Sequence, residues 1–242
     1  MNGFDGVLFD MDGVIFDSER VSVRCWNQAA AQLGISEERM WQVKLQITGT
    51  TAANCRRVLN AEFADVPGFE YDSFRGEYER FYNEVLNQGG IPLKPGAREL
   101  LIWLREHGKK TGLASSTYTE KLMRQIAPSG IAVYFDSIIG GDQVTKSKPD
   151  PEIYLKSLKR LGLDPEKTFG IEDSYNGVRS QHAAGLHPIM VPDILPVTEE
   201  MRGLAEWILD DLQAVQHFFS EMNRQQALSV RSFPVMQQET LT

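Results

Sequence analysis

The chain of 242 residues has few cysteines, no long apolar run and no excess of positive charge. Its two cysteines, Cys25 and Cys55, form no Cys-x-x-Cys pair and have no histidine cluster beside them, which argues against a disulfide framework and a zinc site. No apolar stretch approaches the roughly 18 residues that a membrane helix needs. The net charge of -8 argues against nucleic acid and anionic membranes as partners, because both reward clustered lysine and arginine.

Three common motifs are also missing. The chain has no GxGxxG after its first expected strand, no GxxxxGK[ST] and no GxSxG. Their absence argues against dinucleotide-binding proteins, P-loop enzymes and serine hydrolases of the elbow type. The first strand is expected near Phe4, which leaves no room for a signal peptide, so we expect a cytoplasmic protein.

The hydrophobic pattern predicts an α/β protein built on a parallel sheet. Residues 4–9 are apolar and β-prone, as in a buried strand. From residue 93 onward, strands and helices alternate, which is typical of parallel βαβ units covered on both faces. The further strands are expected at 110–114, 136–140, 168–171, 187–191 and 206–209, and the helices between and after them at 96–107, 118–127, 151–161, 175–185 and 211–222.

A helical region interrupts this alternation soon after the first strand. Apolar residues recur at helical spacing from about residue 18, and further helices are expected at 37–46, 51–64 and 72–88. Gly89, Gly90, Pro92 and Pro95 end the region as a turn signal. We therefore expect an α/β core of residues 1–17 and 93–222, a small helical insertion at 18–92, and a polar, Gln-rich tail at 223–242.

Four polar clusters lie at the expected carboxyl ends of core strands. Ligands of open parallel sheets bind outside the carboxyl ends of the strands, so these clusters are expected to converge there. Each cluster alone has an ordinary explanation as a turn, a helix cap or a solvated loop, but the four together predict an active site. They are Asp10 with Asp12, Ser115 with Ser116, Lys148, and Glu172 with Asp173.

The carboxylates of this set predict a divalent cation. Several carboxylates this close repel one another unless a cation lies between them, and oxygen ligands suit Mg²⁺. We expect Asp10 and Asp173 to bind Mg²⁺, with Glu172 as a third ligand or as support for the other two.

The other members of the set match the requirements of phosphoryl transfer. Asp10 is the expected nucleophile, which forms an aspartyl-phosphate, and Asp12 is the expected acid and base because alternate residues of an extended segment share a face. Lys148 supplies positive charge, and Ser115 supplies a hydroxyl donor to a phosphate oxygen, with Ser116 as a further substrate contact.

At these positions the chain resembles the haloacid dehalogenase superfamily. FDMDGV at 9–14 resembles its first motif, LASS at 113–116 its second, SKPDPEIY at 147–154 its third, and GIEDSYNGV at 170–178 its fourth. The resemblance implies a Rossmann-like core with a small helical cap, Mg²⁺ as cofactor, and metal coordination by the backbone carbonyl of Asp12.

Within the superfamily, Asp12 favours phosphate chemistry, because dehalogenases lack this second aspartate. Phosphonate hydrolases of the family use a cap lysine. The only lysine before residue 94 is Lys44, and we interpret it as a solvated helix residue. The nearest subgroup resembles β-phosphoglucomutase and related sugar-phosphate phosphatases. We therefore expect a phosphatase of small phosphorylated metabolites that works as a monomer.

Two alternatives to the phosphatase stay open. A mutase of this subgroup carries a cap histidine and a Gly-x-Ser-Arg phosphate clamp, whereas this chain has Ser22 at the first position and Gly49-Thr50-Thr51-Ala52 at the second. The other alternative is a binding module without catalysis.

Cap residues are expected to select the leaving group. The better candidates are Asp17 and Gly49, followed by Thr50, whereas Glu19 and Arg24 are interpreted as helix-surface residues. Arg56 and Arg57 are likewise expected to be exposed rather than to replace the missing clamp arginine.

Overall fold

A computed structural model describes residues 3–231 of the chain. Its centre is a six-stranded, entirely parallel sheet in the order β3-β2-β1-β4-β5-β6, which confirms the α/β prediction. All six strands coincide with expected segments. They are β1 (Gly6–Phe9), β2 (Lys110–Ala114), β3 (Ser137–Ile139), β4 (Thr168–Glu172), β5 (His187–Met190) and β6 (Trp207–Ile208).

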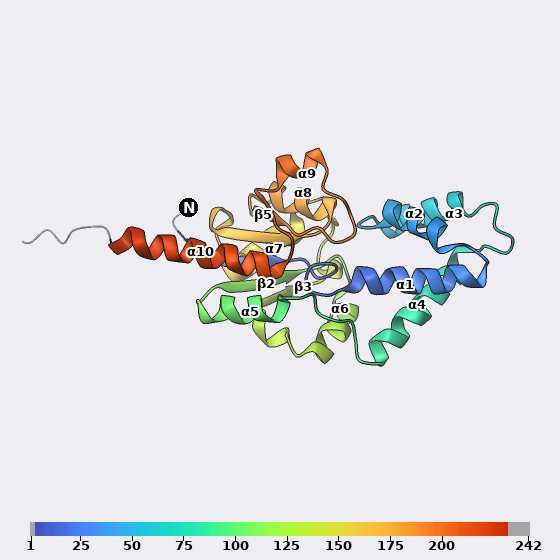
Figure 1. Ribbon diagram of the computed structural model, residues 1–242, viewed down its shortest axis with the longest axis horizontal. Helices are drawn as coiled ribbons and strands as arrows, with labels where there is room; N and C mark the ends of the chain where they lie inside the picture. The colour runs from blue at the N-terminus through green and yellow to red at the C-terminus, as the bar shows by residue number, and fades with distance from the viewer. Residues whose placement is uncertain (1–2, 232–242) are drawn as a thin grey trace, which may run out of the picture.

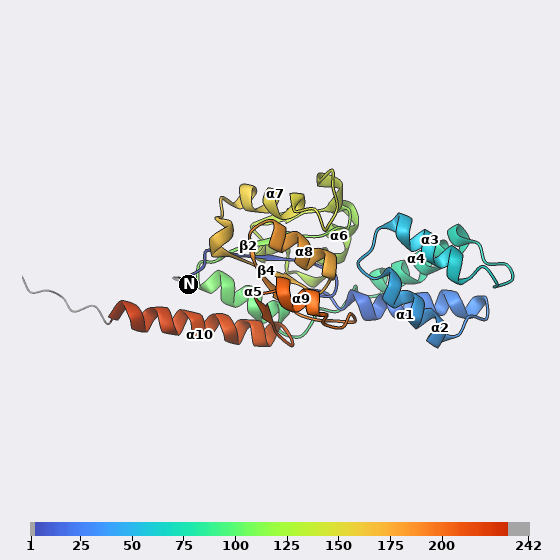
Figure 2. The ribbon, with the colours of Figure 1, turned by 90° about the horizontal axis from the view of Figure 1, so that it is seen from above.

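Helices cover both faces of the sheet, as parallel strands buried on two sides require. Figure 2 shows α7 (Glu152–Leu161) and α8 (Tyr175–Ala183) on one side of the sheet and α5 (Ala97–Glu106) with α10 (Leu212–Arg231) on the other. The remaining core helices are α6 (Thr119–Ile126), which the sequence predicted, and the short α9 (Glu199–Leu204), which it did not.

Four helices inserted after β1 form a separate group, which we call the cap. They are α1 (Ser18–Gln32), α2 (Glu37–Ile47), α3 (Ala52–Glu62) and α4 (Tyr71–Asn87). Figure 1 shows them together at one end of the molecule, beyond the end of the sheet. Side chains cap the starts of α2 and α3, where Ser36 and Thr51 accept hydrogen bonds from the backbone N–H groups of Arg39 and Asn54. The exact division of the chain at residues 17/18 and 92/93 stays a prediction.

The chain enters and leaves the cap through two adjacent segments. The backbone N–H of Asp17 donates to Pro92 O at 2.8 Å, and that of Lys94 donates to Ile15 O at 2.9 Å. An antiparallel bridge between Phe16 and Leu93 lies between these bonds. The two connections therefore form a short paired ladder at the base of the cap.

The last helix is longer than the sequence analysis predicts. We expected a helix at 211–222 followed by a polar tail, but α10 continues to Arg231. The physical reason is the helix propensity of residues such as Gln225 and Ala227 and the absence of glycine or proline before Pro234. The rest of the expected tail, 232–242, lies outside the described residues. Among residues 3–231, no helix combines the length and the apolar character that crossing a membrane requires.

Candidate active site

The register of the sheet brings three of the predicted clusters to one edge. Phe9, the last residue of β1, is paired with Leu113 of β2 and with Ile171 of β4. The residues that follow, Asp10 and Glu172 among them, therefore leave the sheet at the same level. A cavity of about 410 Å³ lies at this edge, and we call it the sheet-edge cavity. Its lining includes Asp10, Asp12, Ser115, Ser116, Lys148 and Asp173.

Lys148, the remaining one of the four predicted clusters, also reaches this edge of the sheet. Its ammonium nitrogen Nζ lies 2.5 Å from Asp10 Oδ1 and 2.6 Å from Glu172 Oε1, and it donates to Ala114 O at 3.0 Å. The lysine is 8% exposed, so these contacts replace its water. Burial opposes its charge, but Asp10 and Glu172 together hold the pKa of Lys148 well above its usual value. Lys148 is therefore a fixed positive charge between two carboxylates.

Glu172 is the most enclosed carboxylate of the site, with no exposed surface. Its Oε1 accepts a second hydrogen bond, from the Tyr154 hydroxyl at 2.8 Å. Its Oε2 accepts from the backbone N–H groups of Asp173 and Ser174 and from Ser174 Oγ, at 3.0–3.2 Å. Both oxygens are thus occupied within the protein, and Glu172 holds Lys148 and the strand end in place. Tyr154 was missed by the sequence analysis.

Asp10, Glu172 and Asp173 together form a buried acidic cluster. One carboxylate oxygen from each lies within 4.8 Å of the other two. Burial raises the pKa of Asp10 to about 8 against the opposing charge of Lys148. Burial, together with the charges of Glu172 and Asp10, also raises the pKa of Asp173 well above its usual value. The cluster thus holds more carboxylates than cations, and the oxygen donors of Asp10 and Asp173 fit a divalent cation such as Mg²⁺.

Gly13 allows the turn after Asp10 to pack against this cluster. It has a φ of +79°, and an added Cβ would lie 2.2 Å from Asp173 Oδ2. Only a residue without a side chain fits here, because both the backbone conformation and the space exclude one.

Asp12 lines the same cavity. Its Oδ2 accepts a hydrogen bond from Thr117 Oγ1 at 3.0 Å, and its Oδ1 lies 3.5 Å from Gln125 Nε2. The backbone N–H of Thr117 donates to Ser115 Oγ at 3.0 Å, which leaves the Ser115 hydroxyl hydrogen free to donate elsewhere. The loop after β2 thus orients both Asp12 and Ser115. Sequence reasoning did not single out Thr117.

The cap contributes Gly49 and Thr50 to the sheet-edge cavity, as the sequence predicts for residues that face the cleft. Gly49 has a φ of +68°, and its carbonyl accepts a hydrogen bond from Asn176 Nδ2 at 2.9 Å. This contact crosses from the cap to α8 of the core. It keeps the Gly49–Thr50 turn over the cavity.

Asp17 is not brought to this cleft, contrary to the sequence prediction. It precedes the first residue of α1, and its carboxylate turns toward Arg20 on the next turn, at 2.7 Å. Together with Arg20, Lys94 and Asp193 it lines a different cavity, beside the paired connections of the cap. There the buried Asp193 lies 2.6 Å from Lys94 Nζ and 3.1 Å from Arg20 Nη1. Asp17 thus belongs to the base of the cap.

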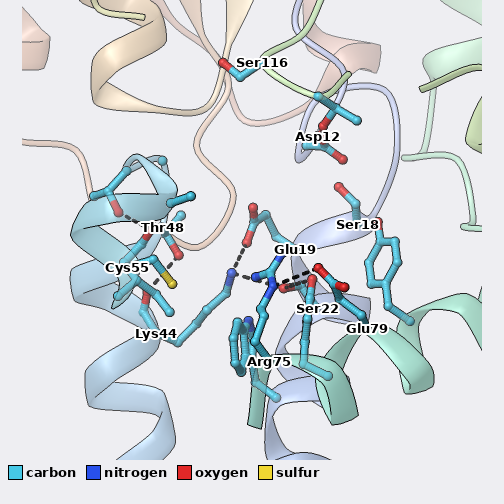
Figure 3. A pocket seen from close by; sticks show the side chains of 18 of the residues that line it. Asp12, Ser18, Glu19, Ser22, Lys44, Thr48, Cys55, Arg75, Glu79 and Ser116 are labelled. Atoms are coloured by element: carbon cyan, nitrogen blue, oxygen red, sulfur yellow. Dashed lines mark hydrogen bonds and ion pairs between the residues drawn. The ribbon is translucent and has the colours of Figure 1, made fainter. Parts of the chain in front are cut away.

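Glu19 and Lys44 correct two other expectations. Both line a second cavity of about 520 Å³, which we call the cap cavity and which Figure 3 shows from close by. Lys44 is only 6% exposed, and its Nζ lies 2.8 Å from Glu19 Oε2 and donates to Ser22 Oγ at 3.2 Å. Lys44 is therefore a buried ion-pair residue rather than a solvated one. Arg24, Arg56 and Arg57 are exposed, as expected.

Comparison with known proteins shows to which family the chain belongs. The family model described as haloacid dehalogenase-like hydrolase matches residues 7–191. Protein CbbY of Cereibacter sphaeroides is 31% identical over 212 residues, which is 85% of this chain and 91% of that protein. The phosphorylated carbohydrates phosphatase of Thermotoga maritima is 32% identical over 187 residues, which is 76% of this chain and 83% of that protein.

A similar solved structure is the HAD family hydrolase of Deinococcus radiodurans R1, which contains bound phosphate and sodium. It has a TM-score of 0.78 and 25% sequence identity, and the match covers 92% of this chain and 98% of that one. The family model spans β1 to the end of β5, and therefore includes every cluster at the sheet edge. The chain belongs to the haloacid dehalogenase-like hydrolases.

Proposed function

We propose that the protein is a Mg²⁺-dependent phosphatase that hydrolyses small, sugar-phosphate-like metabolites through an aspartyl-phosphate on Asp10. The observation that carries this proposal is the contact of Lys148 with Asp10 at the wall of a cavity that Asp12 and Ser115 also line. The names of two relatives, CbbY and a phosphorylated carbohydrates phosphatase, support the substrate class.

In the first step, a carboxylate oxygen of Asp10 attacks the phosphorus atom and the bond to the leaving oxygen breaks. Lys148 and the Ser115 hydroxyl stabilise the charge on the phosphoryl oxygens. Asp12 donates a proton to the leaving oxygen, so that the product departs as a neutral alcohol. The hydrogen bonds from Thr117 and Gln125 keep the Asp12 carboxyl oriented toward the leaving group.

In the second step, water attacks the phosphorus of the aspartyl-phosphate. Asp12, now ionised, takes the proton of the attacking water, and the bond from phosphorus to the Asp10 oxygen breaks. Inorganic phosphate is released and the Asp10 carboxylate is restored. Asp10, Asp173 and the Asp12 carbonyl would hold the metal, with Glu172 beside them. When bound, Mg²⁺ offsets the negative charges of the cluster and of the phosphate.

Hydrolysis is favoured over a mutase reaction by the cap. A mutase must hold the second phosphate of a bisphosphorylated intermediate, and the segment Gly49-Thr50-Thr51-Ala52 contains no arginine for this purpose. The possible replacements, Arg56 and Arg57, are exposed, and Arg56 is paired with Asp72. Water is therefore the proposed final acceptor.

The proposal is tested by assaying p-nitrophenyl phosphate with MgCl₂, with EDTA, and with the Asp10→Asn variant. EDTA and the variant should each lower turnover at least about a thousandfold, because the amide is a poor nucleophile and a weak ligand. Asp5→Asn at the opposite end of β1 is the matched control and should remain active. Wild-type protein that binds phosphate but does not hydrolyse the ester would favour the non-catalytic module instead.

A further inference from the structure

The connection between α2 and α3, residues 48–51, forms part of the wall of the sheet-edge cavity, and we call it the cap turn. Figures 1 and 2 show it extending from the cap toward the core. On its cap side it is held locally, because Thr50 Oγ1 donates to Ile47 O at 2.8 Å and Thr51 caps α3. All four of its residues line the sheet-edge cavity. The position of the cap turn therefore decides how far this cavity is enclosed.

Asn176, in the first turn of α8, holds the cap turn from the core side. Its Nδ2 donates to Gly49 O at 2.9 Å. Gly49 also lies over Ser174, since an added Cβ would be 3.4 Å from Ser174 Cβ, and Ser174 Oγ donates to Glu172 Oε2. The cap turn thus rests on the same loop that carries Glu172 and Asp173.

Asn176 is itself held in one orientation by an ion pair. Its Oδ1 accepts from Arg179 Nη1 at 2.9 Å, one turn further along α8. Arg179 Nε and Nη2 donate to the two carboxylate oxygens of Glu200 on α9, each at 2.6 Å. Because the amide oxygen of Asn176 is engaged by this cation, its NH₂ group is the part presented to Gly49. The contacts therefore form a chain from α9 through α8 to the cap turn.

We propose that Asn176 is a positioning residue of the phosphatase, which holds the cap turn against the core around the leaving group of the substrate, and that Arg179 orients Asn176 for this role. This inference rests on the proposed phosphatase function, because it names a residue that prepares the same cavity for the ester. Without the Asn176 contact, the cap turn spends part of its time away from the core, and the apparent affinity for an ester falls accordingly. A saturating ester restores the enclosed arrangement, so KM should rise while kcat changes little.

The test measures kcat and KM for p-nitrophenyl phosphate in the Asn176→Ala variant. KM should rise about three- to tenfold, the size of one amide–carbonyl hydrogen bond, with kcat within about twofold of the wild-type value. Inorganic phosphate has no leaving group, so its inhibition constant should change by less than about twofold. Asn60→Ala, which replaces an exposed asparagine of α3, is the matched control and should leave KM unchanged. Asn176→Gln keeps an amide donor and should retain part of the wild-type affinity.

A double variant tests whether Arg179 acts through Asn176. Arg179→Met frees the amide to rotate and should raise KM by about two- to threefold. The variant that combines Asn176→Ala with Arg179→Met should have the KM of Asn176→Ala alone, because the arginine then has no amide to orient. Arg202→Met, which removes an exposed cation of α9, should leave KM unchanged. A KM increase in the double variant equal to the product of the two single increases would contradict the chain of contacts.

Hydrogen exchange checks the contact without an assay of activity. The backbone N–H groups of Thr48 and Thr50 are hydrogen-bonded within the cap, and they should exchange at least about threefold faster in Asn176→Ala than in the wild-type protein, because the cap turn opens more often. Alanine has a higher helix propensity than asparagine, so α8 should keep its stability and the melting temperature should not fall. Faster exchange at an unchanged melting temperature therefore reports on the cap turn rather than on general unfolding.

The outcomes separate this inference from the proposed function. An unchanged KM in Asn176→Ala, an equal rise in the inhibition constant of phosphate, or unchanged exchange of the cap turn would overturn the positioning role while wild-type turnover still supported the phosphatase. A lower melting temperature would assign Asn176 to general stability and overturn it as well. Wild-type protein that does not hydrolyse p-nitrophenyl phosphate would remove the phosphatase and this inference with it.

Discussion

Lys148 and Asp10 are 138 positions apart in the chain, and the ammonium nitrogen of one lies 2.5 Å from a carboxylate oxygen of the other. Glu172 accepts from the same ammonium group, so one lysine bridges two acids that would otherwise repel each other. This bridge ties β1, β4 and the loop before α7 into one unit. The residues that are proposed to react also stabilise the edge of the sheet.

Replacing Lys148 by methionine should therefore reduce stability as well as activity. Removing one partner of a buried ion pair leaves uncompensated charge, and the free energy of unfolding should fall by about 3 kcal/mol. Guanidinium denaturation in EDTA measures this. Lys146→Met, two residues away and 71% exposed in its side chain, should change the free energy by less than about 1 kcal/mol. Equal effects of the two variants would contradict the bridging role.

Replacing Gly13 by alanine should disturb the acidic cluster. The added Cβ would lie 2.2 Å from Asp173 Oδ2, so the carboxylate must move. We expect the concentration of Mg²⁺ needed for half-maximal activity to rise at least about tenfold, since one ligand is displaced. Gly34→Ala is the matched control. Gly34 also has a positive φ, at +68°, but nothing lies within 4 Å of the added Cβ. It should cost only the backbone strain and leave the Mg²⁺ requirement unchanged.

The stability of the protein should depend on pH and Mg²⁺ together. Burial raises the pKa of Asp10 to about 8, above the value of an unfolded chain. The folded state therefore holds the proton more tightly, and metal-free protein should lose stability as pH rises from about 4 to about 8. A bound cation requires the ionised carboxylate, so Mg²⁺ should raise the melting temperature more at pH 8.5 than at pH 6. Thermal unfolding in EDTA and in MgCl₂ checks this, and a larger shift at pH 6 would contradict it.

Asp193 should contribute to stability at the base of the cap. Its side chain is fully buried between Lys94 and Arg20, and Asp193→Asn would leave the two cations only the more exposed Asp17 as an acidic partner. We expect a loss of about 3 kcal/mol in the free energy of unfolding. Glu200→Gln, which breaks the exposed pair with Arg179, should cost less than about 1 kcal/mol. Urea denaturation of both variants tests whether the buried ion pair contributes more to the free energy of unfolding than the exposed one.

The strands and the sheet-edge cluster were predictable because short polar segments follow apolar, β-prone ones. Asp10 and Asp173 end neighbouring strands, and parallel strands place such residues together whatever the details of packing. The role of Tyr154 was not predictable. It lies inside a helix, and its hydroxyl reaches Glu172 only because α7 packs against the sheet at one particular angle.

The roles of the cap residues were also hard to predict, because they depend on how the cap helices pack. Asp17 and Glu19 are two positions apart at the start of α1, and which of them faces the cleft depends on the rotation of that helix. The sequence favoured Asp17, whereas the structure turns Glu19 inward to meet Lys44. Lys44 in turn looked solvated because charge patterns alone do not reveal a partner on another helix.

The paired connections at the base of the cap have a topological consequence. The chain departs after Ile15 and comes back at Lys94, and the backbones of these two residues are hydrogen-bonded. The four cap helices are therefore one insertion between two residues of the core that are hydrogen-bonded neighbours. A short turn that joined Ile15 to Lys94 could replace the cap without changing the order of the strands. The sequence and the helices of the cap can accordingly change in evolution while the sheet and the residues at its carboxyl end stay the same.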